Sequence, residues 1–412
     1  MTPDPATTPT PTPDPDRYAR QLQVPGVGDT GQARLAAARV LLVGAGGLGS
    51  AAGLYLAGAG VGTIGIVDDD RVERSNLHRQ IIHRTEDEGR LKVDSGARAL
   101  RELNPEVDVR THPIRLTRDT VLDVVADYDI VVDGADSFMT RALVSDACTL
   151  LDIPHVWAAV LTDGGQLSVF HASKGPVYRD LLPELPPAGS VPSCAVAGVL
   201  GTVPGVLGTA MAGEVLKLIL GIGEPAIGRV LVYDMLTAEW ESVPLARSPR
   251  THRPTAPAEV GADLPRQMSI RDLDPARVAA GGGLIVDVRT PAEAAAGMIP
   301  GAHLLPLAAI EVDPRGALAR VREWVAEAAP ARDAEADVYL HCRSGARSVR
   351  APELLEAAAR DSAPLDGESG AARETASGAD LRFIDLAGGY VAWVRETGPE
   401  AGSEAGRESD PR

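Results

Sequence analysis

One stretch decides the fold of the first half of this chain: Val40-Leu41-Leu42-Val43-Gly44-Ala45-Gly46-Gly47-Leu48-Gly49-Ser50. The apolar run predicts a buried strand, and the glycines that follow have the spacing G-x-G-x-x-G and open a helical run. Glycines let the backbone turn sharply and approach a phosphate, which then meets the free N–H groups at the start of the helix. We therefore expect a nucleotide phosphate at Gly44, Gly46, Gly47 and Gly49.

Short β-branched runs alternate with helical stretches through residues 17–243. The predicted strands cover residues 40–43, 63–67, 130–132 and 167–170. Alternation of this kind predicts an α/β fold, namely a Rossmann-like, mostly parallel sheet with helices on both faces.

Charged residues follow two of these strands. Asp68 ends the second strand, at about the sequence distance from the glycine motif at which an acid holds a ribose hydroxyl. An NAD-dependent dehydrogenase is therefore the first hypothesis. Asn76, Arg79 and Lys92 then place an amide and two cations behind the glycine loop. Hydride transfer does not need them, whereas cleavage of a triphosphate does, because negative charge builds on the leaving pyrophosphate. Asp136 ends a further strand, where a carboxylate can hold Mg²⁺.

A smaller α/β unit is predicted over residues 268–398, with strands at 284–288, 338–341 and 383–385. The nucleotide-binding unit expected before it covers residues 17–245. Residues 246–267 are rich in Pro, Arg, Thr and Ala and are predicted to form a linker. Residues 1–16 and 399–412 are predicted to be disordered, and residues 360–380 to be a flexible insertion.

The second unit carries the run Cys342-Arg343-Ser344-Gly345-Ala346-Arg347-Ser348 between a strand and a helix. A cysteine at such a position meets unpaired backbone N–H groups and the positive end of the helix dipole, which favour thiolate over thiol. Arg343 and Arg347 add positive charge. The run therefore predicts a nucleophilic Cys342 that holds an anion on sulfur.

The totals exclude some classes of protein. A net charge of −17, from 40 Lys+Arg against 57 Asp+Glu, argues against binding to nucleic acid or an anionic membrane. The 3 cysteines are widely separated and suit a reducing cytoplasm. Residues 40–67 and 185–213 are uncharged and long enough to span a bilayer, but glycines and prolines interrupt them, so we expect both to be buried.

Several motifs together resemble the bacterial MoeB/ThiF adenylyltransferases over residues 17–245: Arg17-Tyr18-Ala19-Arg20-Gln21, the glycine loop, Ser75-Asn76-Leu77-His78-Arg79-Gln80, the Asp136 strand end and Val191-Pro192-Ser193-Cys194-Ala195. The resemblance implies that ATP adenylates the C-terminal Gly-Gly carboxylate of a ubiquitin-like sulfur carrier protein. It also implies roles for individual residues: phosphate contacts by Gly44, Gly46, Gly49, Asn76, Arg79 and Lys92, ribose binding by Asp68, Mg²⁺ binding by Asp136, and a reach by Arg20 across a homodimer interface.

The sequence departs from that family at its structural zinc site. Family members usually carry two C-x-x-C pairs, but Val177-Tyr178-Arg179-Asp180 stands in place of the first pair, and no cysteine occurs between Cys194 and Cys342. A tetrahedral Cys₄ site cannot form without these sulfurs. We predict that no zinc is bound and that apolar packing replaces it.

The second unit resembles a rhodanese domain. Asp287-Val288-Arg289-Thr290-Pro291-Ala292-Glu293 and Gly297-Met298-Ile299-Pro300-Gly301-Ala302 match its early motifs. The short spacing from Cys342 to Arg347 favours sulfur, because related phosphatases use a loop one residue longer. The pairing of domains resembles actinobacterial MoeZ-type adenylyltransferase/sulfurtransferases. This implies a Cys342 persulfide, charged by a persulfide or thiosulfate donor, that converts the carrier to a thiocarboxylate for molybdopterin, thiamin, cysteine or tRNA thiolation.

Two other hypotheses stay open at this point. A ubiquitin-like activating enzyme would form a thioester on Cys194 and would not need Cys342. A non-enzymatic persulfide sensor would keep Cys342 and show no ATP chemistry. Cys194 itself is equally compatible with a small residue that packs under a loop, and Cys148 is predicted to be a core residue.

Overall fold

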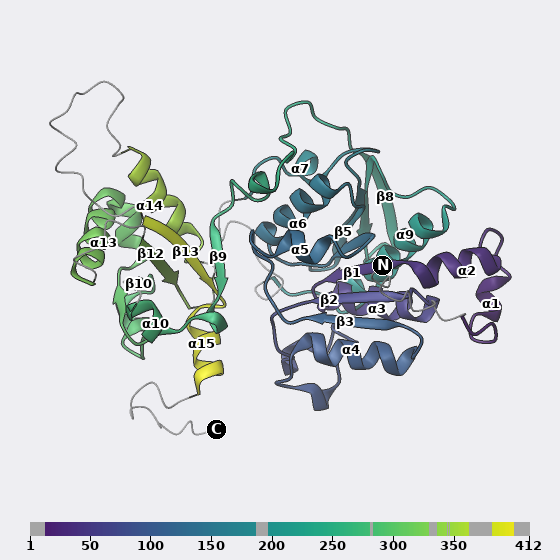
Figure 1. Ribbon diagram of the computed structural model, residues 1–412, viewed down its shortest axis with the longest axis horizontal. Coiled ribbons are helices and arrows are strands. Elements are labelled where there is room, and N and C mark those ends of the chain that lie inside the picture. Colours follow the sequence, from purple (N-terminus) through teal and green to yellow (C-terminus); the bar gives the residue numbers. More distant parts are fainter. Residues whose placement is uncertain are drawn as a thin grey trace, which may run out of the picture. The chain divides into compact units, whose positions relative to one another are not determined.

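The computed structural model describes residues 13–186, 197–280, 283–328, 336–343, 345, 347–361 and 381–398. The chain forms two compact units, and the division falls between Leu264 and Pro265 (Figure 1). Cys194 lies outside the described residues. So do residues 1–12 and 399–412 of the predicted tails and residues 362–380 of the predicted insertion.

Unit 1 is built on an eight-stranded sheet with the order β3-β2-β1-β4-β5-β6-β7-β8. The first five strands in this order are parallel and the last three pair antiparallel. The order changes direction at β1, which lies between β2 and β4, and this is the position where open α/β sheets bind ligands. The strands are β1 (Arg39–Val43), β2 (Thr63–Val67), β3 (Asp108–His112), β4 (Ile130–Asp133), β5 (His155–Leu161), β6 (Gly164–Phe170), β7 (Arg229–Asp234) and β8 (Glu239–Pro244).

Helices cover both faces of this sheet, as the α/β pattern predicted. Leu42 and Ile66 belong to the core under α3 (Gly47–Ala59), α4 (Lys92–Leu103) and α9 (Thr202–Leu220). Leu41 and Val131 point to the other face, against α5 (Val121–Val125) and α6 (Phe138–Leu151). Strands buried on both sides read as continuous apolar runs, which is why they are visible in the sequence. The shorter helices are α1 (Ala19–Leu22), α2 (Gly28–Ala37), η1 (Arg74–Asn76), η2 (Thr85–Asp87), α7 (Tyr178–Leu181) and η3 (Pro257–Glu259).

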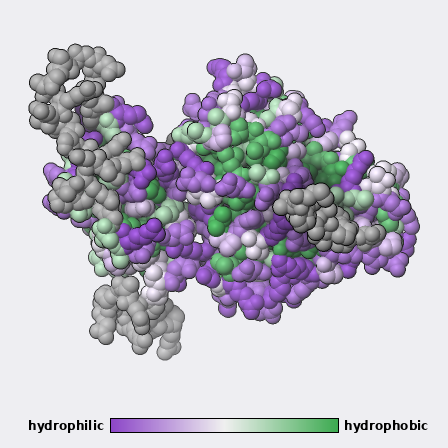
Figure 2. Space-filling view, in the orientation of Figure 1, coloured by the Kyte–Doolittle hydropathy of each residue, from purple (hydrophilic) through white to green (hydrophobic). Residues whose placement is uncertain are grey.

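Length and composition alone would allow α9 to cross a membrane, but 50% of its apolar window is buried inside unit 1. It packs against α3 and the sheet through Leu207, Met211 and Val215, all fully buried. Its burial is that of a core helix. On the face seen in Figure 2 the surface is mostly hydrophilic, and unit 1 shows apolar areas among the polar ones.

Most of the stretch predicted as a linker packs against unit 1. Val260 and Leu264 are buried in the same cluster as Leu143 of α6. The backbone N–H of Gly261 donates to the carboxylate of Asp146 at 3.1 Å. The prediction of a linker is wrong for this part of the stretch. A few apolar residues in a Pro- and Arg-rich sequence anchor it to unit 1.

Ion pairs hold this segment against Arg179 and Asp180 of unit 1. Arg179 donates to the carboxylates of Asp146 and Asp263, both at 2.9 Å. Asp180 accepts from Arg253 at 2.7 Å and from the backbone N–H of Ser248 at 2.9 Å. Burial raises the pKa of Asp146, and Arg179 opposes that rise.

Apolar packing is present beside these pairs. The ring of Tyr178 lies 5.5 Å from that of Trp157 and 5.9 Å from that of Phe170, in one buried aromatic cluster. Tyr178 thus packs in the core, while its neighbours Arg179 and Asp180 form ion pairs.

Unit 2 contains a parallel five-stranded sheet with the order β11-β10-β12-β13-β9. Val286 and Leu340 face the core under α12, α13 and α14, and Ile285 and Leu386 face α15 on the other side. The strands are β9 (Arg266–Ser269), β10 (Leu284–Asp287), β11 (Ala302–Leu304), β12 (Ala336–His341) and β13 (Leu381–Ala387). The helices are η4 (Ile270–Asp272), α10 (Pro275–Ala280), α11 (Pro291–Ala294), α12 (Leu307–Val312), α13 (Pro314–Ala328), α14 (Arg350–Asp361) and α15 (Gly389–Thr397).

Candidate active sites

The register of three strands brings the glycine loop and the acidic strand ends together. Val43 is paired with Val67 on one side and with Asp133 on the other. The loop that begins at Gly44 therefore starts beside Asp68 and beside the loop that carries Asp136. One edge of the sheet thus collects the predicted nucleotide residues.

The glycine loop is a close-packed turn that leads into α3. Gly44 has φ +90°, and a Cβ on Gly49 would lie 2.0 Å from the carbonyl oxygen of Gly44. α3 begins at Gly47 with Gly46 as its N-cap, and no side chain caps it. Its first N–H groups are free for an anion, which fits a phosphate.

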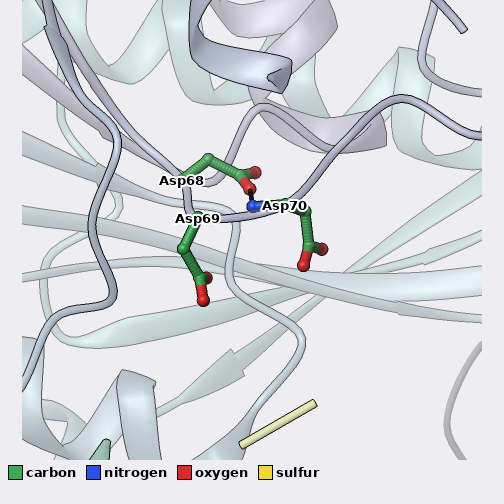
Figure 3. Close-up of side chains that lie close together, drawn as sticks. All are labelled: Asp68, Asp69 and Asp70. Atoms are coloured by element: carbon green, nitrogen blue, oxygen red, sulfur yellow. Dashed lines mark hydrogen bonds between the residues drawn. The ribbon is translucent and has the colours of Figure 1, made fainter. Parts of the chain in front are cut away.

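Asp68 is tied to this loop. Its carboxylate accepts hydrogen bonds from the backbone N–H groups of Ala45 and Asp70, both at 2.8 Å. Figure 3 shows Asp68, Asp69 and Asp70 together at the end of β2, with the Asp68–Asp70 hydrogen bond. Burial raises the pKa of Asp68, and the charge of Lys92 opposes the rise.

Two cations partly offset the charge of the three carboxylates. Lys92 Nζ lies 2.9 Å from Asp70 Oδ2, and Arg115 Nε lies 3.1 Å from Asp69 Oδ2. Burial alone would lower the pKa of both cations, but the neighbouring carboxylates outweigh it and raise them. Sequence reasoning missed Arg115 because the short, partly exposed strand β3 before it was not recognised.

His83 supports the loop from inside and was also missed. Its Nε2 lies 3.0 Å from the carbonyl oxygen of Ala45, and its Nδ1 lies 2.9 Å from Ser95 Oγ. Ser95 in turn donates to Asp87 at 2.8 Å. Burial lowers the pKa of His83 to about 4, so the ring is neutral near pH 7.

Gln80, at the end of the motif that contains Asn76, is a further missed residue. It is 5% exposed, and its Oε1 has no hydrogen-bond partner among the described residues. Its Nε2 lies 3.9 Å from the position of a Cβ built on Gly46. A buried amide with a free oxygen beside the loop indicates a group that a ligand could satisfy.

The remaining predicted nucleotide residues lie around this edge. Asn76 is buried and its Oδ1 accepts from the N–H of Glu73 at 3.2 Å. The carbonyl oxygen of Arg79 lies 3.4 Å from a Cβ built on Gly47, but its guanidinium donates to Ser75 O. Arg20 is exposed on α1.

Asp136 follows β4 and is exposed. Within the described part of the chain its carboxylate has no hydrogen bond or ion pair, so its oxygens are available to a cation such as Mg²⁺. The preceding loop is held by Asp133, which accepts from Ala135 N at 3.0 Å and from the buried His155 at 3.0 Å. The residues therefore fit a metal ion that would be bound with the nucleotide.

In unit 2, Cys342 stands directly after β12, and its side chain is buried at 1% exposure. Its Sγ accepts the backbone N–H groups of Gly345 at 3.2 Å and Arg347 at 3.3 Å, and Ser348 Oγ lies 3.7 Å away. Gly345 has φ +98°, a conformation that a side chain would strain. The loop is thus closed around the sulfur by backbone donors.

The base of the loop is fastened to α15 and β10. The N–H of Tyr390 donates to Cys342 O at 2.8 Å, and that of Val391 donates to Arg343 O at 3.0 Å. Arg289 stacks 3.9 Å above the Tyr390 ring and pairs with buried Asp287 at 2.6 Å. The residues that carry the sulfur are thus bonded to α15, and Tyr390 of α15 is in turn stacked on Arg289 after β10.

The two arginines of the loop differ in their surroundings. Arg343 is exposed, whereas Arg347 pairs through both guanidinium nitrogens with Glu293 of α11, at 2.8 Å and 2.6 Å. Glu293, and to a smaller degree the Cys342 sulfur, raises the pKa of Arg347. The fork of Arg347 thus faces a carboxylate, a contact that sequence reasoning missed.

Two family models match the chain, ThiF family over residues 18–255 and Rhodanese-like domain over residues 274–396. "Probable adenylyltransferase/sulfurtransferase MoeZ" of Mycobacterium tuberculosis is 38% identical over 93% of this chain and 94% of its own length. "Adenylyltransferase and sulfurtransferase MOCS3" of Bos taurus is 38% identical over 92% and 85%. "Sulfur carrier protein adenylyltransferase" of Thermus thermophilus is 49% identical over 57% of this chain and 88% of its own length.

A solved structure shares the fold of part of the chain. The crystal structure of E. coli MccB with MccA-N7isoASN superimposes with a TM-score of 0.52 at 23% identity, over 59% of this chain and 75% of that chain. The match supports the fold alone. The family models and the full-length relatives go further: this chain belongs to the ThiF family and carries a rhodanese-like domain after its ThiF domain.

Proposed function

We propose that this enzyme adenylates the C-terminal Gly-Gly carboxylate of a ubiquitin-like sulfur carrier protein and then transfers sulfur to it from a persulfide on Cys342. A carboxylate is a poor electrophile, so the first reaction supplies an activated acyl group, and the second supplies a sulfur nucleophile. The relatives that match nearly the whole chain bear both activities in their names.

In the first reaction the carrier carboxylate attacks the α-phosphorus of ATP, and pyrophosphate leaves. The glycine loop and the start of α3 would hold the phosphates, and Asp68 the ribose. Lys92, Asn76 and Arg79 would stabilise the charge that builds on pyrophosphate. Asp136 would hold Mg²⁺, which neutralises phosphate charge when bound.

In the second reaction the outer sulfur of the Cys342 persulfide attacks the acyl-adenylate carbonyl, and AMP leaves with the bonding electrons. The product is an acyl disulfide between the carrier and Cys342. A thiol then attacks the Cys342 side of that disulfide and releases the carrier thiocarboxylate.

One observation carries the proposal: the Cys342 Sγ accepts two backbone N–H groups in a closed loop, in a chain that also has a complete phosphate loop. Donors aimed at one sulfur suit an anionic persulfide. We further propose a cytoplasmic homodimer in which Arg20 reaches the partner's nucleotide, no bound zinc, and a persulfide or thiosulfate donor.

The test is to incubate the protein with ATP, Mg²⁺, thiosulfate, a thiol reductant and a purified carrier that ends in Gly-Gly, and then to determine the mass of the carrier. We expect the mass gain of one sulfur in place of one oxygen. A carrier that forms a thioester with Cys194 and gains no sulfur would favour the conjugation-type activity. Persulfide on Cys342 with no pyrophosphate release would favour a sensor.

A further inference from the structure

Glu293 pairs with the side chain of Arg347, which belongs to the loop around the Cys342 sulfur. We call this loop, residues 342–348, the sulfur loop. Arg347 donates its backbone N–H toward Cys342 Sγ at 3.3 Å, and both of its guanidinium nitrogens contact Glu293, at 2.8 Å and 2.6 Å. A bidentate Arg–carboxylate pair is the strongest geometry available to these groups. Glu293 therefore engages two nitrogens of the guanidinium and offsets much of the positive charge that Arg347 brings near the sulfur.

The local chain fixes the position of this carboxylate. Glu293 forms a capping box at the start of α11, in which its Oε2 accepts from Thr290 N at 3.0 Å and from Thr290 Oγ1 at 2.9 Å. The hydrogen bonds from Arg347 are the main cause that lowers the pKa of Glu293, and the Thr290 donors contribute less. The carboxylate therefore stays charged throughout the neutral range. The pair is held from both ends.

The charge near the sulfur is thus smaller than the two arginines of the loop suggest. Glu293 compensates Arg347, and Arg343 is the arginine of the loop that stays exposed and forms no ion pair with the described residues. A donor that brings two negative charges to a thiolate needs cations to offset the repulsion. A donor with one negative charge needs fewer.

We propose that Glu293 determines specificity for the sulfur donor, by disfavouring a dianion such as thiosulfate relative to a persulfide that carries a single negative charge on its terminal sulfur. The inference rests on the proposed function, because it assumes that Cys342 accepts sulfur. Glu293 acts through Arg347 and does not touch the reacting sulfur.

The two loading reactions are chemically alike and differ in charge. With thiosulfate, the Cys342 thiolate attacks the outer sulfur, the S–S bond of thiosulfate breaks, and sulfite leaves with the electron pair. With cysteine persulfide, the same attack releases cysteine thiolate. Each forms one S–S bond on Cys342 and breaks one, with no added oxidant or reductant.

The test compares the full chain with Glu293→Gln, which removes the charge and keeps the capping box, since Gln serves there as well as Glu. Glu311→Gln is the matched control, because Glu311 pairs with Arg350 at 3.1 Å in the same unit and forms no hydrogen bond or ion pair with Cys342, Arg343, Gly345, Arg347 or Ser348, the described residues of the loop. Sulfite release from thiosulfate and cysteine release from cysteine persulfide give KM and kcat for each donor, and mass spectrometry confirms loading of Cys342.

We expect Glu293→Gln to lower the KM for thiosulfate about 3- to 10-fold, and the KM for cysteine persulfide less than about 2-fold. The gain for thiosulfate should shrink at high salt. Glu311→Gln should change neither value, and Glu293→Asp, which keeps the charge, should restore most of the wild-type donor preference.

An unchanged or higher KM for thiosulfate in Glu293→Gln would overturn the inference. So would equal changes for both donors, since a structural role would affect both. If Glu293→Gln does not fold, a Glu293→Asp protein with an unchanged donor preference supports the charge argument, and one that loses the preference contradicts it. A wild-type protein that loads no sulfur from either donor would instead remove the proposed function.

Discussion

Nε2 of His83 lies 3.0 Å from the carbonyl oxygen of Ala45, while the N–H of the same Ala45 donates to Asp68 at 2.8 Å. Both backbone polar groups of one glycine-loop residue are thus held by side chains of the connection between β2 and β3. A carbonyl only accepts, so the ring proton of His83 belongs on Nε2. His83 therefore positions the glycine loop through the Ala45 carbonyl.

Replacing His83 with Leu should weaken nucleotide binding. The Ala45 carbonyl would lose its partner, at a cost of about 1–3 kcal/mol, so we expect the KM for ATP in ATP–pyrophosphate exchange to rise about 10-fold or more. Thiosulfate sulfurtransferase activity of the same preparation is the internal control and should not change. Unaltered exchange kinetics would show that the loop does not depend on this hydrogen bond.

His83 should titrate far below an ordinary histidine. Burial lowers its pKa to about 4, so the folded protein binds fewer protons than the unfolded chain between pH 6.5 and 4. The neutral ring supports folding above that window, and this support, roughly 3 kcal/mol, is lost as the pH falls through it. NMR of the histidine rings measures the midpoint, with the His83→Leu spectrum for assignment. A midpoint near 6.5 would contradict the burial argument.

Asp136→Asn should separate the two activities. The change keeps the size of the side chain and removes the charge that would hold Mg²⁺, so we expect ATP–pyrophosphate exchange to fall by about 100-fold or more. Sulfur loading of Cys342 should persist at the wild-type rate. Exchange that survives this substitution would mean that the metal is held elsewhere.

Cys342→Ala should give the reverse result. The phosphate loop and Cys342 belong to different sheets, so exchange should stay within about 2-fold of wild type. Thiocarboxylate on the carrier should disappear, which mass spectrometry detects directly. Loss of both activities would argue against separate sites.

Arg179→Met should destabilise unit 1. Asp146 has a side chain that is 6% exposed, and loss of its partner leaves a buried charge, so we expect the free energy of unfolding to fall by about 3 kcal/mol. Asp263→Ala removes a partner that is 63% exposed and should cost less than about 1 kcal/mol. Urea denaturation compares the two, and a chelator should leave the wild-type curve unchanged. Equal effects of the two substitutions would show that burial does not decide the contribution.

The candidate site residues that could be predicted from the sequence are those next to a recognisable local sequence pattern. Gly44, Asp68 and Asp136 each follow a buried parallel strand, and such strands are visible because both of their faces are apolar. The fold class followed from the same alternation. The register of β1 with β2 and β4 then brings these residues to one edge.

The residues that were missed have no such pattern. Arg115 and His83 are single side chains whose roles depend on which loops the topology brings together. Glu293 stood in a recognised motif, but its pairing with Arg347 spans 54 positions of the chain. Strand β8 (Glu239–Pro244) was not predicted because all of its side chains are exposed and show no apolar alternation.

The attachment of residues 248–264 to unit 1 bears on how sulfur reaches the adenylate. After Leu264, which is buried, Pro265 alone precedes β9 at Arg266. One residue spans at most about 3.6 Å, so the chain segment that joins the two units is a short tether. A short tether gives the two sites of one chain a high effective concentration if it can span the distance between them, and an effective concentration near zero if it cannot. Insertion of a few residues at Pro265 would therefore act on the rate of transfer within one chain far more strongly than on either site.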